Sequence, residues 1–303
     1  MGALTVRKTA FAACLVMLTA AGTLAGASDM EARRDAQHRI NVSGRQRMLS
    51  ERIAKAACLA ARDPANGQQM QEMTEARTLF VASMKALTAG SKEIGLAPEP
   101  QVAPVLETTT QLADQYDLAV DQFTAAFPAQ RYQEKLEWIY DLSLPVLTGL
   151  NDAVEYLEAQ HKDGHLIRRG LAIALNVSGR QRMLSQKMSK EVCEIASGYQ
   201  PEETRKHLKG TIALFMSSHE QLKRGVMEMK IAEKDGLPIV SQLMLVERHW
   251  RELSKIYIRV SEDGAPSEQD LKTIAVESKT FLAELNRAVE MYEAIDIPPG
   301  VSQ

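Results

Sequence analysis

The sequence predicts an all-α protein made of two tandem four-helix bundles with up-down-up-down topology. Together the bundles form an intramolecular pseudo-dimer that follows an N-terminal signal peptide. Three observations support this prediction. Aromatic residues make up only 5% of the chain while good helix formers abound, the chain repeats itself at a fixed offset, and Gly, Pro and polar clusters divide each repeat into four stretches of helical length.

The repeat is marked by one decapeptide. NVSGRQRMLS occurs at residues 41–50 and again at 176–185, with ten identities in ten positions and an offset of 135 residues. The same offset superposes Cys58 on Cys193 and Asn151 on Asn286. Because the shift stays constant along the whole repeat, neither copy has a net insertion, and we expect both copies to fold in the same way.

The repeat and the Gly, Pro and polar clusters divide the chain into a signal segment at 1–27 and two modules, at 28–162 and 163–303. Short connections favour antiparallel neighbouring helices within each module. The expected helices lie near residues 31–62, 68–90, 101–127 and 130–161 in the first module, and near 165–197, 202–232, 237–261 and 267–295 in the second.

The link between the modules is short. An up-down-up-down bundle ends where it began, so the second module has to restart at that end of the first. If the bundles lie side by side, their first helices run parallel and the two decapeptides face each other across a pseudo-twofold axis. The linker residues His161 and His165 have the spacing of a helical metal pair, but no Cys or acidic cluster accompanies them, so we interpret them as structural.

The N-terminus has the pattern of a secretory signal. Arg7 and Lys8 precede an uncharged apolar run at 9–24, and small residues lead up to Ser28. We expect cleavage after Ala27 and a periplasmic location. An uncleaved membrane anchor is the alternative, but the run is shorter than the roughly 20 residues that a spanning helix needs. No later segment is apolar enough to cross a membrane, so we do not expect an integral membrane protein after cleavage.

The net charge argues against one class of partner, and the cysteine content allows one disulfide. Loss of Arg7 and Lys8 takes the formal net charge from −3 to −5, which makes nucleic acid a poor partner. Cys58 and Cys193 remain, in a compartment that permits a disulfide. Equivalent positions near a pseudo-twofold axis are either within bonding reach or are two buried free thiols, and the sequence leaves both possibilities open.

The decapeptide helix has two inward-facing stripes. On a helical wheel, one stripe is apolar and suits the core of its own bundle: Val42, Leu49, Ile53, Ala56 and Ala60. The opposite stripe is small and polar but bordered by apolar residues: Gly44, Arg47, Glu51, Ala54 and Cys58. We therefore expect this helix to be buried on both sides, with the second stripe against the sister module.

Arginine in this second stripe indicates an anion site. Arg47 and its repeat equivalent Arg182 each offer a planar fork of N–H donors that stays charged at physiological pH. Two facing cations repel each other unless an anion lies between them. Gly44 and Gly179, one turn upstream, permit a close approach of the two backbones.

Segments 41–55 and 176–190 resemble the signature helix of PilJ-type sensory domains, which is similar to the ligand-recognition helix of nitrate/nitrite sensor (NarX-like) histidine kinases. The shared skeleton is Asn, then Gly three residues on, Arg six on, Met seven on and Ser nine on. The resemblance implies a periplasmic four-helix bundle that binds nitrate or nitrite between two such helices, with Arg47 and Arg182 as the contacts. The candidate ligand-binding residues are Asn41, Gly44, Arg47, Ser50, Asn176, Gly179, Arg182 and Ser185. Either serine could instead bond to its own helix backbone.

The chain departs from this family pattern in three ways. It holds two modules rather than one, we expect no membrane helix or output domain after them, and the flanks of the decapeptides differ at Glu51/Gln186 and Arg52/Lys187. We also expect Glu51 to lie near Arg47 as a possible counterion.

The leading functional hypothesis is a stand-alone sensory protein that binds a small anion and signals through a membrane receptor or sensor kinase. The alternative is a helical interaction or structural protein that kept the fold without the ligand. No catalytic motif, metal-ligand cluster or cofactor motif occurs in the sequence, so we expect neither an enzyme nor a cofactor or metal site.

Overall fold

The computed structural model describes residues 10–128, 132–163, 167, 169–228 and 233–295. Over these residues the chain forms eight α-helices and no strand, which confirms the all-α prediction. The first module holds α1 (Ala10–Arg62), α2 (Gly67–Ala89), α3 (Ala103–Ala126) and α4 (Tyr132–Asp163), and the second holds α5 (Arg169–Ala196), α6 (Pro201–Glu228), α7 (Glu233–Ser261) and α8 (Glu268–Glu293).

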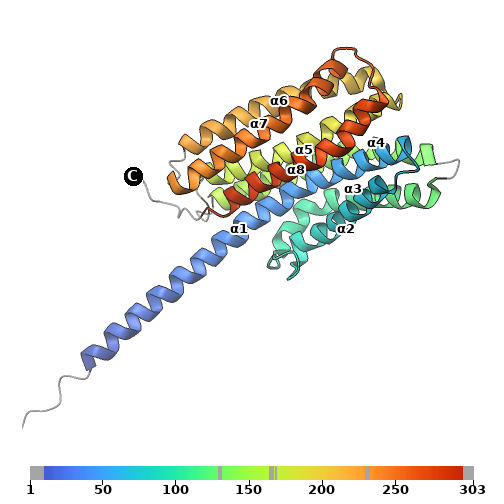
Figure 1. Cartoon of the computed structure of the whole chain (residues 1–303). Helices are drawn as coiled ribbons and strands as arrows, with labels where there is room; N and C mark the ends of the chain where they lie inside the picture. The colour runs from blue at the N-terminus through green and yellow to red at the C-terminus, as the bar shows by residue number, and fades with distance from the viewer. Residues whose placement is uncertain (1–9, 129–131, 164–166, 168, 229–232, 296–303) are drawn as a thin grey trace, which may run out of the picture.

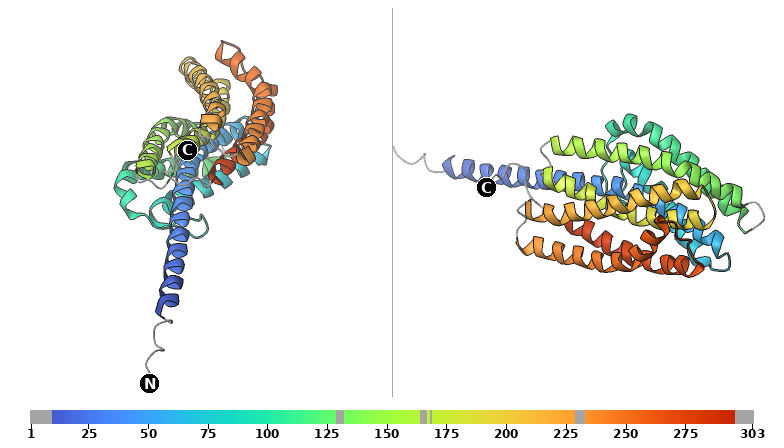
Figure 2. Two further views of the ribbon diagram at one scale, coloured as in Figure 1. Left: turned by 90° about the vertical axis from the view of Figure 1, so that its left-hand side faces the viewer. Right: turned by 90° about the horizontal axis from the view of Figure 1, so that it is seen from above.

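The two bundles lie side by side along their first helices. Helix α1 packs against α2 and α4 of its own module, α5 packs against α6 and α8, and α1 and α5 make the most extensive helix pair in the molecule. Figure 1 shows α1 and α5 at the centre, with α2 and α3 on one side and α6 and α7 on the other. The two further views in Figure 2 show the same side-by-side arrangement.

Local sequence sets several helix ends. The Asn66 side chain accepts a hydrogen bond from the amide of Gln68 at the start of α2, and Ser267 and Asp270 form a capping box at the start of α8. After α2 the chain turns at Gly90, whose φ of 73° suits glycine and where a Cβ would lie 2.6 Å from the nitrogen of Pro98.

Two predicted helix starts are wrong. Helix α1 begins at Ala10 rather than near residue 31, so residues 10–27 of the predicted signal segment are continuous with the bundle helix, and this part of α1 projects beyond the bundles (Figure 1). Helix α7 begins at Glu233, so Gly236 and Pro238 lie inside it. Pro238 is the sixth residue of α7, past the first four amides that lack a partner within a helix, so it removes one hydrogen bond from the helix.

Some expectations fall on residues outside the description. These are residues 1–9 of the signal segment, 164–166 and 168 of the link, which include His165, and 229–232 and 296–303 of the second module. His161 belongs to α4. Among the described helices, none is long and apolar enough to cross a membrane.

The hydrophobic core is shared by the two modules. One cluster of buried side chains draws on all eight helices, for example Leu49, Phe80, Phe123, Ile139, Val192, Phe215, Tyr257 and Phe281. A second cluster joins Ile40 of α1 to Leu171 and Leu175 of α5. Because apolar burial is continuous across the α1–α5 contact, the modules form one folding unit that resembles a dimer core.

Candidate functional site

The candidate site lies in the seam where α1 meets α5. We call residues 41–50 with 176–185 the proximal level of the seam, and residues 51–62 with 186–197 the distal level. At the proximal level the helices touch through glycine: a Cβ on Gly44 would lie 3.9 Å from the Cα of Gly179, and one on Gly179 would lie 3.8 Å from the Cα of Gly44. Equivalent residues thus meet each other, as a parallel in-register pair requires.

Arg47 crosses the seam toward the second module. Its Nη2 donates to the side-chain Oδ1 of Asn176 at 2.9 Å and to the Asn176 carbonyl oxygen at 3.3 Å. Its Nη1 donates to Oδ1 of Asn151, on α4 of its own module, at 3.2 Å. The side chain is 1% exposed. A buried guanidinium is therefore held by neutral acceptors from both modules.

Arg182 repeats this arrangement in the opposite direction. Its Nη2 donates to Oδ1 of Asn41 at 2.8 Å and to the Asn41 carbonyl oxygen at 3.3 Å, and its Nη1 lies 3.4 Å from Oδ1 of Asn286. Each partner is the repeat equivalent of the corresponding partner of Arg47, at the offset of 135 residues. The proximal level therefore obeys the pseudo-twofold symmetry down to individual hydrogen bonds.

The charges of these two arginines are not paired directly with acids. Neither guanidinium forms an ion pair within the described residues, and Nε of each is buried without a hydrogen-bond partner there. Burial lowers the pKa of Arg47 to about 9, and the positive charges of Arg180 and Arg182 add to this effect. Burial, followed by the charge of Arg45, lowers the pKa of Arg182 to about 10. The seam thus carries concentrated positive charge away from solvent.

Each asparagine that accepts a hydrogen bond from an arginine also donates one to a glutamate. Asn176 donates its Nδ2 to Glu158 at 2.5 Å, and Asn41 donates in the same way to Glu293. Glu158 and Glu293 are themselves repeat equivalents. These bonds orient each asparagine so that its oxygen faces the arginine, which is how an outer residue fixes a residue of the site.

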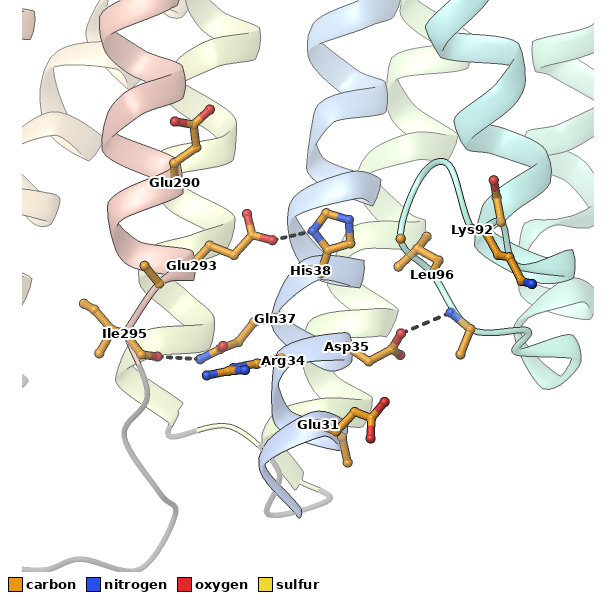
Figure 3. A pocket seen from close by; sticks show the side chains of 15 residues that line it. Glu31, Arg34, Asp35, Gln37, His38, Lys92, Leu96, Glu290, Glu293 and Ile295 are labelled. Carbon is orange, nitrogen blue, oxygen red and sulfur yellow. Dashed lines mark hydrogen bonds and ion pairs between the residues drawn. The ribbon is translucent and has the colours of Figure 1, made fainter. Parts of the chain in front are cut away.

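One end of this chain of bonds reaches a large open pocket. Figure 3 shows His38 of α1 pointing at Glu293 of α8 inside this pocket of about 1080 Å³. His38 Nδ1 bonds to Glu293, and its Nε2 lies 2.7 Å from the carbonyl oxygen of Ile94. The hydrogen bond to Glu293 raises the pKa of His38, while burial opposes the rise. Burial also acts to raise the pKa of Glu293, but the bonds to His38 and Asn41 outweigh it and lower that pKa.

Two candidate residues face their own helix. The hydroxyl of Ser50 donates to the carbonyl oxygen of Arg47 at 3.0 Å, and that of Ser185 donates to the carbonyl oxygen of Arg182 at 2.7 Å. The structure therefore brings together Asn41, Gly44, Arg47 and their equivalents in the second module, whereas both serines bond to backbone one turn back.

The ion pairs of the distal level break the symmetry. Glu51 does not act as the counterion of Arg47, as the sequence led us to expect: its carboxylate lies 3.0 Å from Lys190 across the seam, and Ser143 bonds to both. The equivalent lysine, Lys55, pairs instead with Glu72 of α2 at 2.8 Å. Glu51 lies one turn beyond Arg47, level with Lys190 of the other module, and this buried lysine needs an acid to balance its charge.

A disulfide closes the distal level. Cys58 and Cys193 are bonded, with their Cα atoms 6.2 Å apart. The two sulfurs come from equivalent positions, so the bond lies at the pseudo-twofold axis and links the two modules covalently. Of the two possibilities that the sequence left open, the structure has the disulfide.

Sequence reasoning missed Asn151, Asn286, Glu158 and Glu293 as parts of the site. All four residues lie in α4 and α8, more than 100 residues along the chain from the decapeptide of Arg47. Local spacing in the sequence therefore does not connect them to that arginine. The repeat itself offered the clue, because the segments 151–159 and 286–294 align as NDAVEYLEA and NRAVEMYEA.

Comparison with known proteins agrees with the two-module architecture. A family model described as the N-terminal region of type IV pili methyl-accepting chemotaxis transducers, PilJ, matches residues 30–137 and again residues 167–276. The chain belongs to the PilJ family. The matched regions include both decapeptides and both lysines of the seam, so this chain carries two copies of a sensory signalling domain.

A chemoreceptor is among the relatives. The chain is 31% identical over 120 residues to the methyl-accepting chemotaxis protein McpN of Pseudomonas aeruginosa. The aligned region covers 40% of this chain and 22% of that relative. The chain thus spans about a fifth of the length of that curated relative. No solved structure matches the chain significantly.

Proposed function

We propose that this protein is an exported sensory protein that binds a small planar oxyanion, nitrate or nitrite, between Arg47 and Arg182. The observation that carries the proposal is the pair of buried guanidiniums that reach across one seam and bond, among the described residues, to neutral acceptors alone. Such a pair is repelled by its own charge, and an anion between its members would relieve that repulsion.

Planar geometry favours this class of anion. Each guanidinium keeps its Nε donor without an acceptor among the described residues, and an arginine edge with parallel N–H groups suits two oxygens held in one plane. Gly44 and Gly179 let the guanidiniums lie against the helix backbones, since a Cβ on either glycine would lie 3.4 Å from Nη2 of Arg47. The resemblance of the decapeptides to nitrate-recognition helices supports the same choice.

Export and signalling complete the proposal. The apolar segment before Ser28 and the Cys58–Cys193 disulfide support a location in the periplasm, where disulfides persist. The partner would be a membrane receptor or a sensor kinase that recognises the bundle. Binding at the seam would change the relative positions of α1 and α5 and bias which surface the partner meets.

The experiment is isothermal titration calorimetry of nitrate and nitrite into the purified protein and into an Arg47→Ala, Arg182→Ala double variant. We expect binding to the wild type and loss of binding in the double variant. A matched control replaces Arg45 and Arg180, the other arginine pair of the decapeptides, with alanine; this variant should still bind. If the wild type shows no heat of binding, or the two double variants behave alike, the site assignment is wrong.

A second function has one observation in its favour. The Nη2 atoms of both arginines already have asparagine acceptors, so the seam is also satisfied in part as a purely structural joint. Under this alternative the protein is a helical interaction protein without a ligand. Its thermal stability would then not change with millimolar nitrate, although it would fall when either arginine is replaced.

A further inference from the structure

A second cavity lies at the other end of the module interface, far from the arginines. This distal pocket has a volume of about 640 Å³ and is enclosed by the end of α1, the start of α2 and the start of α8. Because α1 and α2 belong to the first module and α8 to the second, its occupant would touch both modules. The volume falls within the range of small-molecule sites.

The pseudo-symmetry shows what the pocket lacks. The repeat equivalent of Ala275, which lines the pocket, is Tyr140, and the equivalent of Val276 is Asp141. In the sister position, Tyr140 is buried against the ring of Tyr199, with 4.8 Å between ring centroids, and Tyr199 bonds to Asp141. The protein thus fills one copy of this site with its own aromatic side chains and leaves the other copy open.

The residues that line the distal pocket indicate which kind of molecule fits it. Leu59, Leu271, Ala275 and Val276 form an apolar wall, and Val276 is 64% exposed. At the rim three cations outnumber two carboxylates. Arg62 pairs with Glu268, and Lys279 lies 3.5 Å from Glu72, but Lys272 has no ion pair or hydrogen bond in the described part of the chain.

We propose that the distal pocket binds a monocyclic aromatic carboxylate. Its ring would occupy the volume that Tyr140 fills in the sister site, and its carboxylate would pair with Lys272 at the rim. An aromatic ring buries a large apolar area on such a wall, and the cation at the rim selects acids over neutral rings.

Calorimetry or ligand-observed NMR with benzoate tests this proposal, with acetate and benzyl alcohol as probes that each lack one half of the chemistry. We expect benzoate to bind at least tenfold more tightly than either. Lys272→Gln should weaken benzoate binding and leave benzyl alcohol unchanged. Ala275→Tyr, which copies the sister site, should reduce benzoate binding at least tenfold.

Because a tyrosine at 275 could disturb the fold, Val276→Asp provides a second variant at an exposed position, again copying the sister residue. It should also reduce benzoate binding, whereas Val105→Asp, a matched change on α3 outside the pocket, should not. Absence of benzoate binding to the wild type, equal affinity for benzyl alcohol, or unchanged binding in both Ala275→Tyr and Val276→Asp would overturn the proposal. The Arg47→Ala, Arg182→Ala variant should bind benzoate normally, which separates this site from the proposed anion site.

Discussion

The polar contacts of equivalent residues match at the proximal level of the seam and differ at the distal level. At the proximal level, equivalent residues do equivalent things: Arg47 bonds to Asn176 and Asn151 as Arg182 bonds to Asn41 and Asn286. At the distal level, equivalent lysines take different acids, Glu72 from the same module for Lys55 and Glu51 from the other module for Lys190. The same pair of helices thus has symmetric hydrogen bonds over one stretch and asymmetric ion pairs over the next.

Sequence identity explains this difference. The two decapeptides are identical, and Gly44 and Gly179 touch each other, so each decapeptide is part of the environment of the other. Farther along, the acids have no acidic equivalents, because Glu51 corresponds to Gln186 and Glu72 to His207. The two lysines therefore cannot take equivalent acids, and each charge is balanced by a different element.

Removal of the disulfide should have the largest effect on this comparison. The bond closes a loop of 135 residues, so Cys58→Ser with Cys193→Ser should lower the free energy of unfolding by about 4 kcal/mol, chiefly because the unfolded chain gains entropy. Urea denaturation measures this loss. Reductant should destabilise the wild type by a similar amount and leave the double variant unchanged; equal sensitivity of both proteins would contradict the prediction.

The next effect tests the distal asymmetry. Glu72 is buried, and although burial acts to raise its pKa, the charges and hydrogen bonds of Lys55 and Arg52 hold that pKa at about 2. Glu72→Gln should lower the free energy of unfolding by about 3 kcal/mol at neutral pH because it leaves Lys55 buried without an acid. In the wild type this contribution is present above the unfolded pKa of Glu72 and is lost as the pH falls toward 2.

Glu51→Gln is the matched variant and should cost less, about 1 kcal/mol. Lys190 keeps Glu194 at 3.6 Å. Burial raises the pKa values of Glu191 and Glu194, and the charge of Glu51 raises them further, so its removal relieves repulsion between carboxylates. Chemical denaturation of both variants measures the difference, and equal losses for Glu72→Gln and Glu51→Gln would show that the two charge clusters are equivalent after all.

A smaller effect concerns pH at the proximal end. His38 bonds to Glu293, whereas its repeat equivalent is Ile173, which does not titrate. Because the folded state raises the pKa of His38, its stabilising contribution is complete below the unfolded pKa of about 6.5 and is lost as the pH rises through the folded pKa. Thermal melts at pH 6 and pH 8.5 should show a smaller loss of stability in His38→Asn than in the wild type; parallel curves would refute the role of His38.

The smallest expected difference tests the proximal symmetry itself. Arg47→Ala and Arg182→Ala each remove the same set of bonds from equivalent helices. In nitrate-free buffer their free energies of unfolding should therefore agree within about 0.5 kcal/mol, the margin within which independent mutational effects usually add. A larger gap, measured by urea denaturation, would mean that the acids behind the arginines, Glu158 and Glu293, do not act alike.

The sequence alone determined the repeat, the all-α class and the parallel pairing of the decapeptide helices. Helical periodicity identified the second stripe of α1, and the structure places Gly44 and Cys58 of that stripe against their equivalents. These features follow from the spacing of residues and from the constant repeat offset, and the linear sequence contains both.

Only the tertiary structure decided the partners of the buried charges. The acid for Lys190 is on α1 and the acid for Lys55 is on α2, and Asn151 and Asn286 come from helices more than 100 residues away from the arginines they meet. An ion pair depends on a few ångströms between side chains, and a helical wheel gives the direction of a residue but not its neighbour across a seam. The repeated decapeptide therefore fixes where the two modules meet, while the surrounding helices decide how the charge in the seam is balanced.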